Sequence, residues 1–362
     1  MIYRITRYLI DLTVLTIILS IALIYSVQAN SQPMNTGILE NYLSQQDLSG
    51  GILLVSTQDK ILVSVSGIAE RSTNVAVTPQ SRFYLASSGK TIVAAAVLGF
   101  VEDGTLQLDG LVWPFIKDID NVDKLANSDA VTLRQLLNHT SGLPDYLDDV
   151  FFAASERQPQ KIWAPSEAIA FALEFPATGE PGEAFEYSNT NYVLLGHILA
   201  GISGSLEAAL EEKVFSNAEM METSVGKPNS TLLLARGYIE RDFLDVSDLA
   251  WASVLGDGPV ISTAGDLAKF AVALFRDKKI IGAKLLKQMQ TGSDVNDSYG
   301  LGIGIDGDEW GNWFGHAGSY EGFEADFRYY PEEEVVFIFL TNGNPLDDEP
   351  ILDVIAESFF DE

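Results

Sequence analysis

No cysteine occurs in the 362 residues, which excludes disulfide bonds, thiolate nucleophiles and lipid attachment through an N-terminal cysteine. Histidine is nearly absent as well: His139, His197 and His316 are the only three, and they lie far apart along the chain. The sequence therefore offers no ligand set for a structural or catalytic zinc ion. We expect the protein to use no metal and no other cofactor.

Positive charge is scarce. The chain has 22 Lys and Arg residues against 51 Asp and Glu residues, a formal net charge of −29. So acidic a surface repels phosphate backbones, and we expect no nucleic-acid partner. With 47% hydrophobic and 20% charged residues the composition is that of a globular protein, long enough for one two-lobed domain or two modest ones. Nothing in the sequence implies a stable protein partner.

The N-terminal segment has the features of an export signal. Arg4 and Arg7 precede an apolar run over residues 12–27, and small residues stand three and one positions before a possible cleavage site after Ala29. The pattern predicts a signal peptide and an exported, periplasmic or extracellular protein. The alternative is an uncleaved membrane anchor, because the run is only slightly shorter than the ~17–25 residues that span a bilayer.

The hydrophobic pattern predicts a sheet built from both ends of the chain. Residues 50–67 are expected to form two strands joined by a polar turn, and residues 87–101 a buried helix that ends at Gly104. Near the other end, strands and helices are expected at 261–275 (a helix capped by Ser262 or Thr263), 299–305, 312–318, 324–330, 335–342 (four strands) and 351–360 (a helix).

The middle of the chain is expected to be mainly helical, because apolar helical segments alternate there with loops marked by proline and glycine. We therefore predict an α/β (α+β) fold, an antiparallel sheet flanked by helices with a helical lobe inserted. The predicted units are the signal peptide, 1–29, and a mature domain, 30–362, with an α/β lobe of about 37–106 and 251–362 and a helical lobe of about 107–250.

Ser87 and Lys90 are the first candidates for chemistry. Residues three apart share one face of a helix, so Lys90 can lie beside Ser87. A serine hydroxyl needs a neighbour to take its proton, and a buried lysine kept away from carboxylates is suited to the task when neutral. The other Ser-x-x-Lys, Ser224 to Lys227, precedes Pro228 and no apolar helix, so it has no helix face to share.

Two further motifs occur once each. Tyr187-Ser188-Asn189 is the only Tyr-x-Asn and lies on a predicted loop before a helix, and His316-Ala317-Gly318 is the only His-x-Gly and lies in a glycine-rich strand. Either motif alone is weak, since both combinations are common in loops and strands. Together with Ser87 and Lys90, in this order, they are specific.

With these motifs the chain resembles the serine β-lactamase and penicillin-binding superfamily, whose motifs are S-x-x-K, S-D-N and K-T-G. It is similar in particular to the branch that holds class C β-lactamases, D-alanyl-D-alanine carboxypeptidases, D-aminopeptidases and related esterases, where Tyr-x-Asn replaces Ser-x-Asn. Three longer stretches match that branch: FYLASSGKT around Ser87, LLNHTSGLPDY from Leu136 and ISTAGDLAKF from Ile261.

The resemblance implies a serine hydrolase that acylates Ser87 and then hydrolyses the acyl-enzyme, with Lys90 and Tyr187 moving the protons. The implied partner is a small-molecule or peptide substrate, first of all a D-amino-acid peptide such as a cell-wall stem peptide. The alternatives are an esterase, a weak class C-like β-lactamase acting on a β-lactam, and, from another class, a penicillin-binding sensor without turnover.

The resemblance also implies that Asn189 holds the substrate's amide, that the strand with His316 and Gly318 binds the acyl portion, and that the backbone N–H groups of Ser87 and Ser319 form the oxyanion hole. His316 stands where many relatives have lysine. Histidine, with an ordinary pKa near 6.5, is mostly neutral at pH 7, which favours peptidase or esterase action over efficient β-lactamase action.

The other two histidines are not predicted to belong to the site. His139 precedes Gly142 at the end of a predicted helix, where turn chemistry explains it. His197 lies inside an apolar helix and is expected to be a core histidine with a satisfied hydrogen bond.

Overall fold

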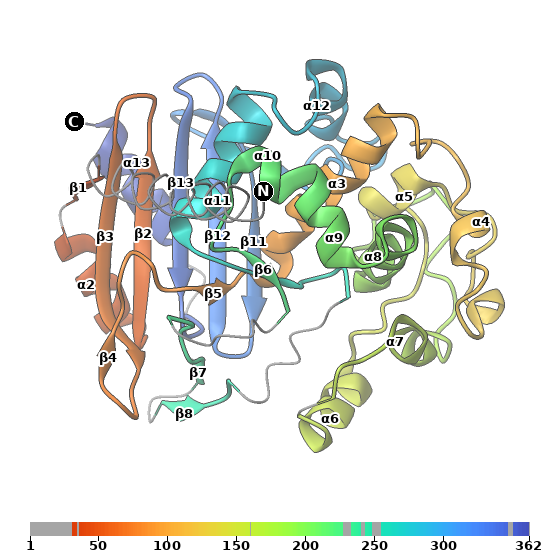
Figure 1. The fold of residues 1–362 in the computed structure, drawn as a ribbon, viewed down its shortest axis with the longest axis horizontal. Helices are drawn as coiled ribbons and strands as arrows, with labels where there is room; N and C mark the ends of the chain where they lie inside the picture. Colours follow the sequence, from red (N-terminus) through yellow and green to blue (C-terminus); the bar gives the residue numbers. More distant parts are fainter. Residues whose placement is uncertain are drawn as a thin grey trace, which may run out of the picture.

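The computed structural model describes residues 31–34, 36–159, 161–226, 233–239, 243–247, 255–346 and 350–361. The predicted signal peptide lies outside these residues. The main sheet has eight strands: β1 (Ser31–Pro33), β2 (Gly50–Ser56), β3 (Ile61–Glu70), β4 (Val75–Ala76), β10 (Gly304–Asp308), β11 (Gly311–Tyr320), β12 (Phe323–Tyr330) and β13 (Val335–Thr341). Their order is β1-β3-β2-β13-β12-β11-β10, with β4 paired to β3 (Figure 1).

The sheet joins the two ends of the chain, as predicted. β2 pairs antiparallel with β13, with Gly51 opposite Thr341, and the predicted turn between β2 and β3 lies between Ser56 and Ile61. Among the described pairs of this sheet only β1 and β3 are parallel. The fold is therefore an antiparallel sheet flanked by helices.

Helices cover both faces of this sheet. They are α2 (Thr36–Gln45), α3 (Gly89–Glu102), α11 (Ala264–Ala271) and α13 (Ile351–Phe360). A further helix, α12 (Ala283–Met289), packs into the core cluster that holds α3 and α11. Side chains alternate between the faces along each strand, so Leu53 and Phe339 pack with α2 and α13, whereas Leu54 and Ile338 belong to the cluster that holds α3 and α11. Burial on both faces explains why β13 is apolar from Val335 to Leu340.

The segment between the two halves of the sheet is mainly helical and lies beyond β11, away from β1 and β3 (Figure 1). Its helices are α4 (Trp113–Ile116), α5 (Leu133–Leu137), α6 (Asp149–Arg157), α7 (Pro165–Ala172), α8 (Asn189–Ser203), α9 (Leu206–Leu210) and α10 (Ser216–Ala218). Two small sheets connect it to the rest: β5 (Phe83–Tyr84) with β9 (Val260–Ser262) and β6 (Ser224–Val225), and β7 (Tyr238–Ile239) with β8 (Leu244–Asp245).

Two element boundaries differ from the prediction. Ser87 lies in a short 3-10 turn, η1 (Ala86–Ser88), and α3 begins only at Gly89. The strand expected at 299–305 begins at Gly304, because the preceding residues pack on α3 as a loop. Gly302 there has a φ of +77°, and its carbonyl accepts a hydrogen bond from Thr91 Oγ1 at 2.8 Å. A strand cannot pass through that left-handed backbone.

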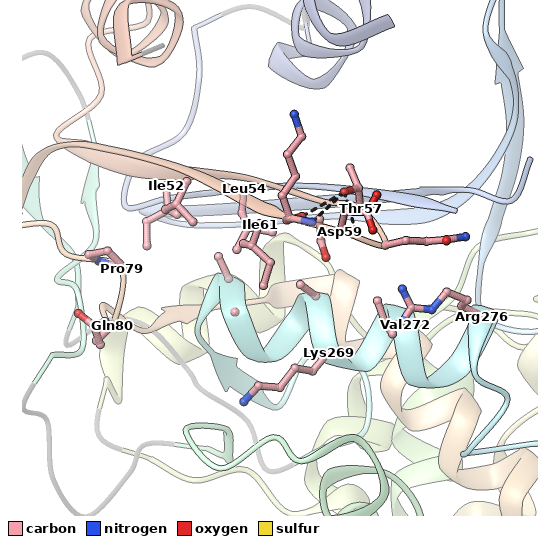
Figure 2. A pocket seen from close by; sticks show the side chains of 17 residues that line it. Ile52, Leu54, Thr57, Asp59, Ile61, Pro79, Gln80, Lys269, Val272 and Arg276 are labelled. Carbon is pink, nitrogen blue, oxygen red and sulfur yellow. Dashed lines mark hydrogen bonds between the residues drawn. The ribbon is translucent and has the colours of Figure 1, made fainter. Parts of the chain in front are cut away.

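A groove of about 690 Å³ separates the β2–β3 hairpin from α11. Figure 2 shows Ile52, Leu54 and Ile61 on the strand side of this groove and Val272, in the helical turn that continues α11, on the other. Neither Ser87 nor Lys90 lines it.

In the part of the chain that the structure describes, no single helix is long and apolar enough to cross a membrane. One pair, Asn189–Ser203 with Leu206–Ala218, meets the length and composition criteria only when taken together, and it is bent by 81°. The same residues contain no group of three or more His, Asp or Glu side chains placed to hold a metal ion.

Candidate active site

The turn that carries Ser87 is held in an unusual conformation. Ala86 is buried and has a φ of +47°, a left-handed backbone that costs a non-glycine residue free energy. Ser88 Oγ lies 2.7 Å from the carbonyl of His316 and 3.0 Å from that of Ala325, and so ties the turn to β11 and β12. The turn therefore presents a half-buried Ser87 at a fixed distance from the sheet.

Lys90 lies directly behind Ser87 and is fully buried. Its Nζ is 2.9 Å from Ser87 Oγ, 2.8 Å from Asn189 Oδ1 and 2.6 Å from the carbonyl oxygen of Asp257. The last two oxygens only accept. An ammonium can donate to all three partners, and a neutral amine can donate to the two oxygens and receive the Ser87 proton on its lone pair. The site thus accommodates Lys90 in both protonation states.

Two carboxylates support Lys90, and neither was predicted. Asp145 accepts hydrogen bonds from the backbone N–H of Asn189 at 3.0 Å and from its Nδ2 at 2.9 Å, which turns Asn189 Oδ1 towards Lys90. Burial raises the pKa of Asp145, although these hydrogen bonds and the charge of Lys90 oppose the shift. Tyr146 donates its hydroxyl to Asp257 Oδ2 at 2.6 Å and so fixes the residue whose carbonyl faces Lys90.

Tyr187 lies at the entrance to this cluster and is 37% exposed. The centre of its ring is 5.2 Å from Lys90 Nζ and 6.4 Å from the ring of His316. Tyr187 precedes Ser188, the N-cap of α8, so the predicted loop before a helix is confirmed. The motif residues Tyr187, Lys90 and His316 therefore share one site.

His139 also belongs to this site, contrary to our expectation that only turn chemistry explains it. It does follow α5 with a φ of +56°, but its buried ring stacks on Tyr187 with centroids 4.1 Å apart. His139 Nδ1 accepts a hydrogen bond from the Ser188 backbone N–H at 3.1 Å. Burial lowers the pKa of His139 well below 6.5, helped by the nearby charge of Lys90, so the ring is neutral at pH 7.

Both ring nitrogens of His316 are occupied by the protein. Nδ1 lies 2.6 Å from the carbonyl of Ala317, to which it must donate, and Nε2 lies 2.9 Å from the hydroxyl of Tyr299. Burial raises the pKa of Tyr299 well above 10, so its hydroxyl donates and Nε2 accepts. Burial also lowers the pKa of His316 to about 4, and His316 carries no charge at neutral pH.

Gly318 lies against the backbone of the Ser87 turn. A Cβ atom at this position would be 2.3 Å from the carbonyl oxygen of Leu85 and 2.7 Å from the backbone nitrogen of Ser87. Only glycine allows the strand to approach so closely.

The neighbouring Ser319 has its backbone N–H at a free strand edge. The pairing of β10 with β11 ends at Gly315, whose carbonyl faces Gly304 of β10. Backbone groups of alternate residues point to the same edge of a strand, so the N–H of Ser319 points to this edge as well, beyond the end of β10. Its side-chain Oγ accepts a hydrogen bond from Asn344 at 3.2 Å.

The structure thus brings together every residue that the sequence assigned to the site: Ser87, Lys90, Tyr187, Asn189, His316, Gly318 and Ser319. Ser224 lies elsewhere, in β6, and Lys227 lies outside the described residues. His197 is half-buried rather than in the core, with Nε2 3.3 Å from Asp118 Oδ1 at the surface.

A sequence model of the family described as Beta-lactamase matches residues 35–358. The chain belongs to the beta-lactamase family. It is 28% identical to penicillin-binding protein 4* of Bacillus subtilis over 84% of this chain and 70% of that protein. It is 25% identical to the D-aminopeptidase of Brucella anthropi over 81% of this chain, and it spans 56% of that protein's length.

The fold of this beta-lactamase family member is shared by solved structures. An octameric penicillin-binding protein homologue from Pyrococcus abyssi superposes with a TM-score of 0.77 and 26% identity, over 91% of this chain and 78% of that one. A D-amino acid amidase from Ochrobactrum anthropi superposes with a TM-score of 0.75 and 23% identity, over 90% of this chain and 98% of the amidase chain. The predicted antiparallel sheet with flanking helices is confirmed.

Proposed function

We propose that this chain is a serine hydrolase of the D-alanyl-D-alanine carboxypeptidase and D-amino-acid peptidase kind, which works through an acyl-enzyme on Ser87. The observation that carries the proposal is the set of hydrogen bonds around Lys90, which places a buried amine 2.9 Å from Ser87 Oγ. The similarity to a penicillin-binding protein and to a D-aminopeptidase supports the substrate class.

The first half-reaction acylates the enzyme. Ser87 Oγ attacks the carbonyl carbon of the substrate as its proton passes to the neutral amine of Lys90, which keeps its hydrogen bonds to Asn189 and Asp257. The backbone N–H groups of Ser87 and Ser319 stabilise the negative charge that develops on the carbonyl oxygen. The C–N bond then breaks, and the leaving amine takes a proton through Lys90 and Tyr187.

The second half-reaction hydrolyses the ester on Ser87. Water attacks the acyl carbon, loses one proton to the same pair of Lys90 and Tyr187, and displaces Ser87, which recovers its hydroxyl. The products are the free acid and the unmodified enzyme. Asn189, predicted to hold the substrate's amide, has both ends of its side chain engaged by Lys90 and Asp145, so it also orients the base.

An esterase is the second candidate, and the state of His316 favours it. A neutral imidazole whose two nitrogens contact Ala317 and Tyr299 has no N–H left for a substrate carboxylate. The binding strand therefore suits uncharged acyl groups. Because the pKa of His316 is about 4, its charge does not change above about pH 5, and activity on neutral substrates should show no step from this residue.

A substrate panel on the purified mature protein tests the proposal. We expect turnover of D-amino-acid peptides or amides in preference to the L-isomers.

Covalent labelling tests the nucleophile. A fluorophosphonate or penicillin adduct should be located on Ser87 by mass mapping. Ser224→Ala is the matched control and should leave labelling unchanged. An adduct on any other serine contradicts the assignment. Turnover of esters alone would establish the esterase, and a stable adduct without turnover would establish a penicillin-binding sensor.

We also propose that the protein is exported and cleaved after Ala29. Support comes from the sequence alone: two arginines, an apolar run and small residues before the cleavage site. N-terminal sequencing of exported material should give Asn30 or a residue next to it. An intact Met1 in a membrane fraction would establish the uncleaved anchor instead.

A further inference from the structure

His139 contacts three consecutive residues of the segment that carries Tyr187. Its carbonyl accepts a hydrogen bond from the Glu186 N–H at 2.9 Å, its ring stacks on Tyr187, and its Nδ1 accepts the Ser188 N–H at 3.1 Å. Three different groups of His139 make these contacts: its backbone carbonyl, the face of its ring and its Nδ1 atom. A single residue therefore fixes both the ring of Tyr187 and the backbone on either side of it.

The stacked ring is the closest aromatic neighbour of Tyr187. The centroids of Tyr299 and His316 lie 6.2 and 6.4 Å from that of Tyr187, whereas the centroid of His139 lies at 4.1 Å with the rings inclined by 25°. Tyr187 is exposed on its outer side, so burial alone does not hold the ring. The orientation of the Tyr187 ring therefore depends on its stacking against the ring of His139.

The hydrogen bonds of His139 require a ring with an unprotonated Nδ1. The Ser188 backbone N–H is a donor under all conditions, and Asn191 Nδ2 approaches the same nitrogen at 3.1 Å. A lone pair must face them, so the ring proton sits on Nε2. A neutral His139 also adds no second positive charge next to Lys90.

We propose that His139 is the positioning residue of Tyr187, which holds the phenol in the orientation that proton transfer with Ser87 and Lys90 requires. The inference rests on the proposed function, because orientation matters only if Tyr187 moves a proton. His139 does not touch the substrate; it acts through the ring that it supports and through the backbone of residues 186–188.

The variant His139→Asn separates the two contacts. Asparagine tolerates the left-handed backbone at this position, and its side-chain oxygen can replace Nδ1 as the acceptor for Ser188, but it offers no ring face to Tyr187. We expect kcat to fall about tenfold with KM changed less than about twofold, since small misplacements of a reacting group affect mainly the chemical step. In a Tyr187→Phe background, which lacks the hydroxyl, His139→Asn should lower kcat no further.

The control is His197→Asn, a histidine of α8 outside the site, which should leave kcat unchanged in both backgrounds. If Tyr187→Phe itself leaves kcat unchanged, the proposed role of Tyr187 fails, and the inference fails with it. If Tyr187→Phe lowers kcat and His139→Asn lowers it equally in both backgrounds, the proposed function stands and the inference alone is overturned.

A measurement on the unaltered protein covers the case in which His139→Asn does not fold. Nitrogen NMR of ¹⁵N-histidine-labelled protein at pH 7 should show His139 with Nδ1 unprotonated and Nε2 protonated. A proton on Nδ1 would overturn the inference, because the ring could not then accept the Ser188 N–H.

Discussion

Replacing Lys90 with methionine is expected to lower kcat/KM by roughly 10²–10⁴-fold while the chain still folds. Methionine fills most of the buried volume but cannot take the Ser87 proton. It also removes the hydrogen bonds that Lys90 donates to the oxygens of Asn189 and Asp257, at a cost of about 1–3 kcal/mol each in the free energy of unfolding. Steady-state kinetics and denaturant unfolding give the two quantities separately.

Lys213→Met is the matched control for Lys90→Met. Lys213 is partly buried, pairs with Asp103 and Glu212, and packs over Phe100, away from Ser87. Its substitution should change stability and leave kcat/KM unaltered. An active Lys90→Met protein would show that Tyr187 alone accepts the serine proton, and would remove Lys90 from the mechanism proposed above.

The second large effect is expected for Gly318→Ala. The added methyl group would overlap the Leu85 carbonyl and the backbone nitrogens of Ser87 and Ser88, at 2.3 to 2.7 Å, and backbone atoms cannot move aside as a flexible side chain can. Either β11 or the turn that carries Ser87 must shift, which moves the two oxyanion-hole donors, the backbone N–H groups of Ser87 and Ser319, apart from each other. We expect labelling of Ser87 and kcat/KM to fall on the order of 10²-fold.

Gly201→Ala provides the comparison, because Gly201 lies in α8 with no atom within 4 Å of the new methyl group. Alanine is the better helix former by about 1 kcal/mol, so this variant should be slightly more stable and fully active. Full activity of Gly318→Ala would mean that the strand does not contribute to the oxyanion hole.

Much of the fold was predictable because its signals are local. The two strands before and after Gln58 and Asp59, and the apolar run that becomes β13, show their type within a few residues. The start of β10 could not be predicted from local signals, because the left-handed backbone at Gly302 follows from packing on α3. The position of Ser87 in a 3-10 turn was missed because residues three apart lie close together in that turn and in an α-helix alike.

The site divides in the same way. The sequence identified four residues of the site: Ser87, Lys90, Tyr187 and His316. They were recognisable because their motifs are rare in this chain and follow one another in the order typical of the family.

Asp257 had no comparable signal. His139 and Asp145 lie in LLNHTSGLPDY, a stretch that matches the family branch, but the resemblance assigned neither residue a role in the site. Each acts through a contact with a motif residue that is distant in sequence, and two more carboxylates do not stand out among 51 acidic residues. Their positions follow only from the folded structure.

The pairing of β2 with β13 determines when the protein can finish folding. Gly51 of β2 pairs with Thr341 of β13, which is synthesised almost 300 residues later. A chain that emerges from the ribosome therefore contains β2 and β3 long before it contains β13, the central strand of the sheet. Contacts between such distant segments close large loops and fold slowly. Loss of the last thirty or so residues would remove β13 and split the sheet, and every partly synthesised chain exposes β2 as an unpaired edge that a chaperone can bind.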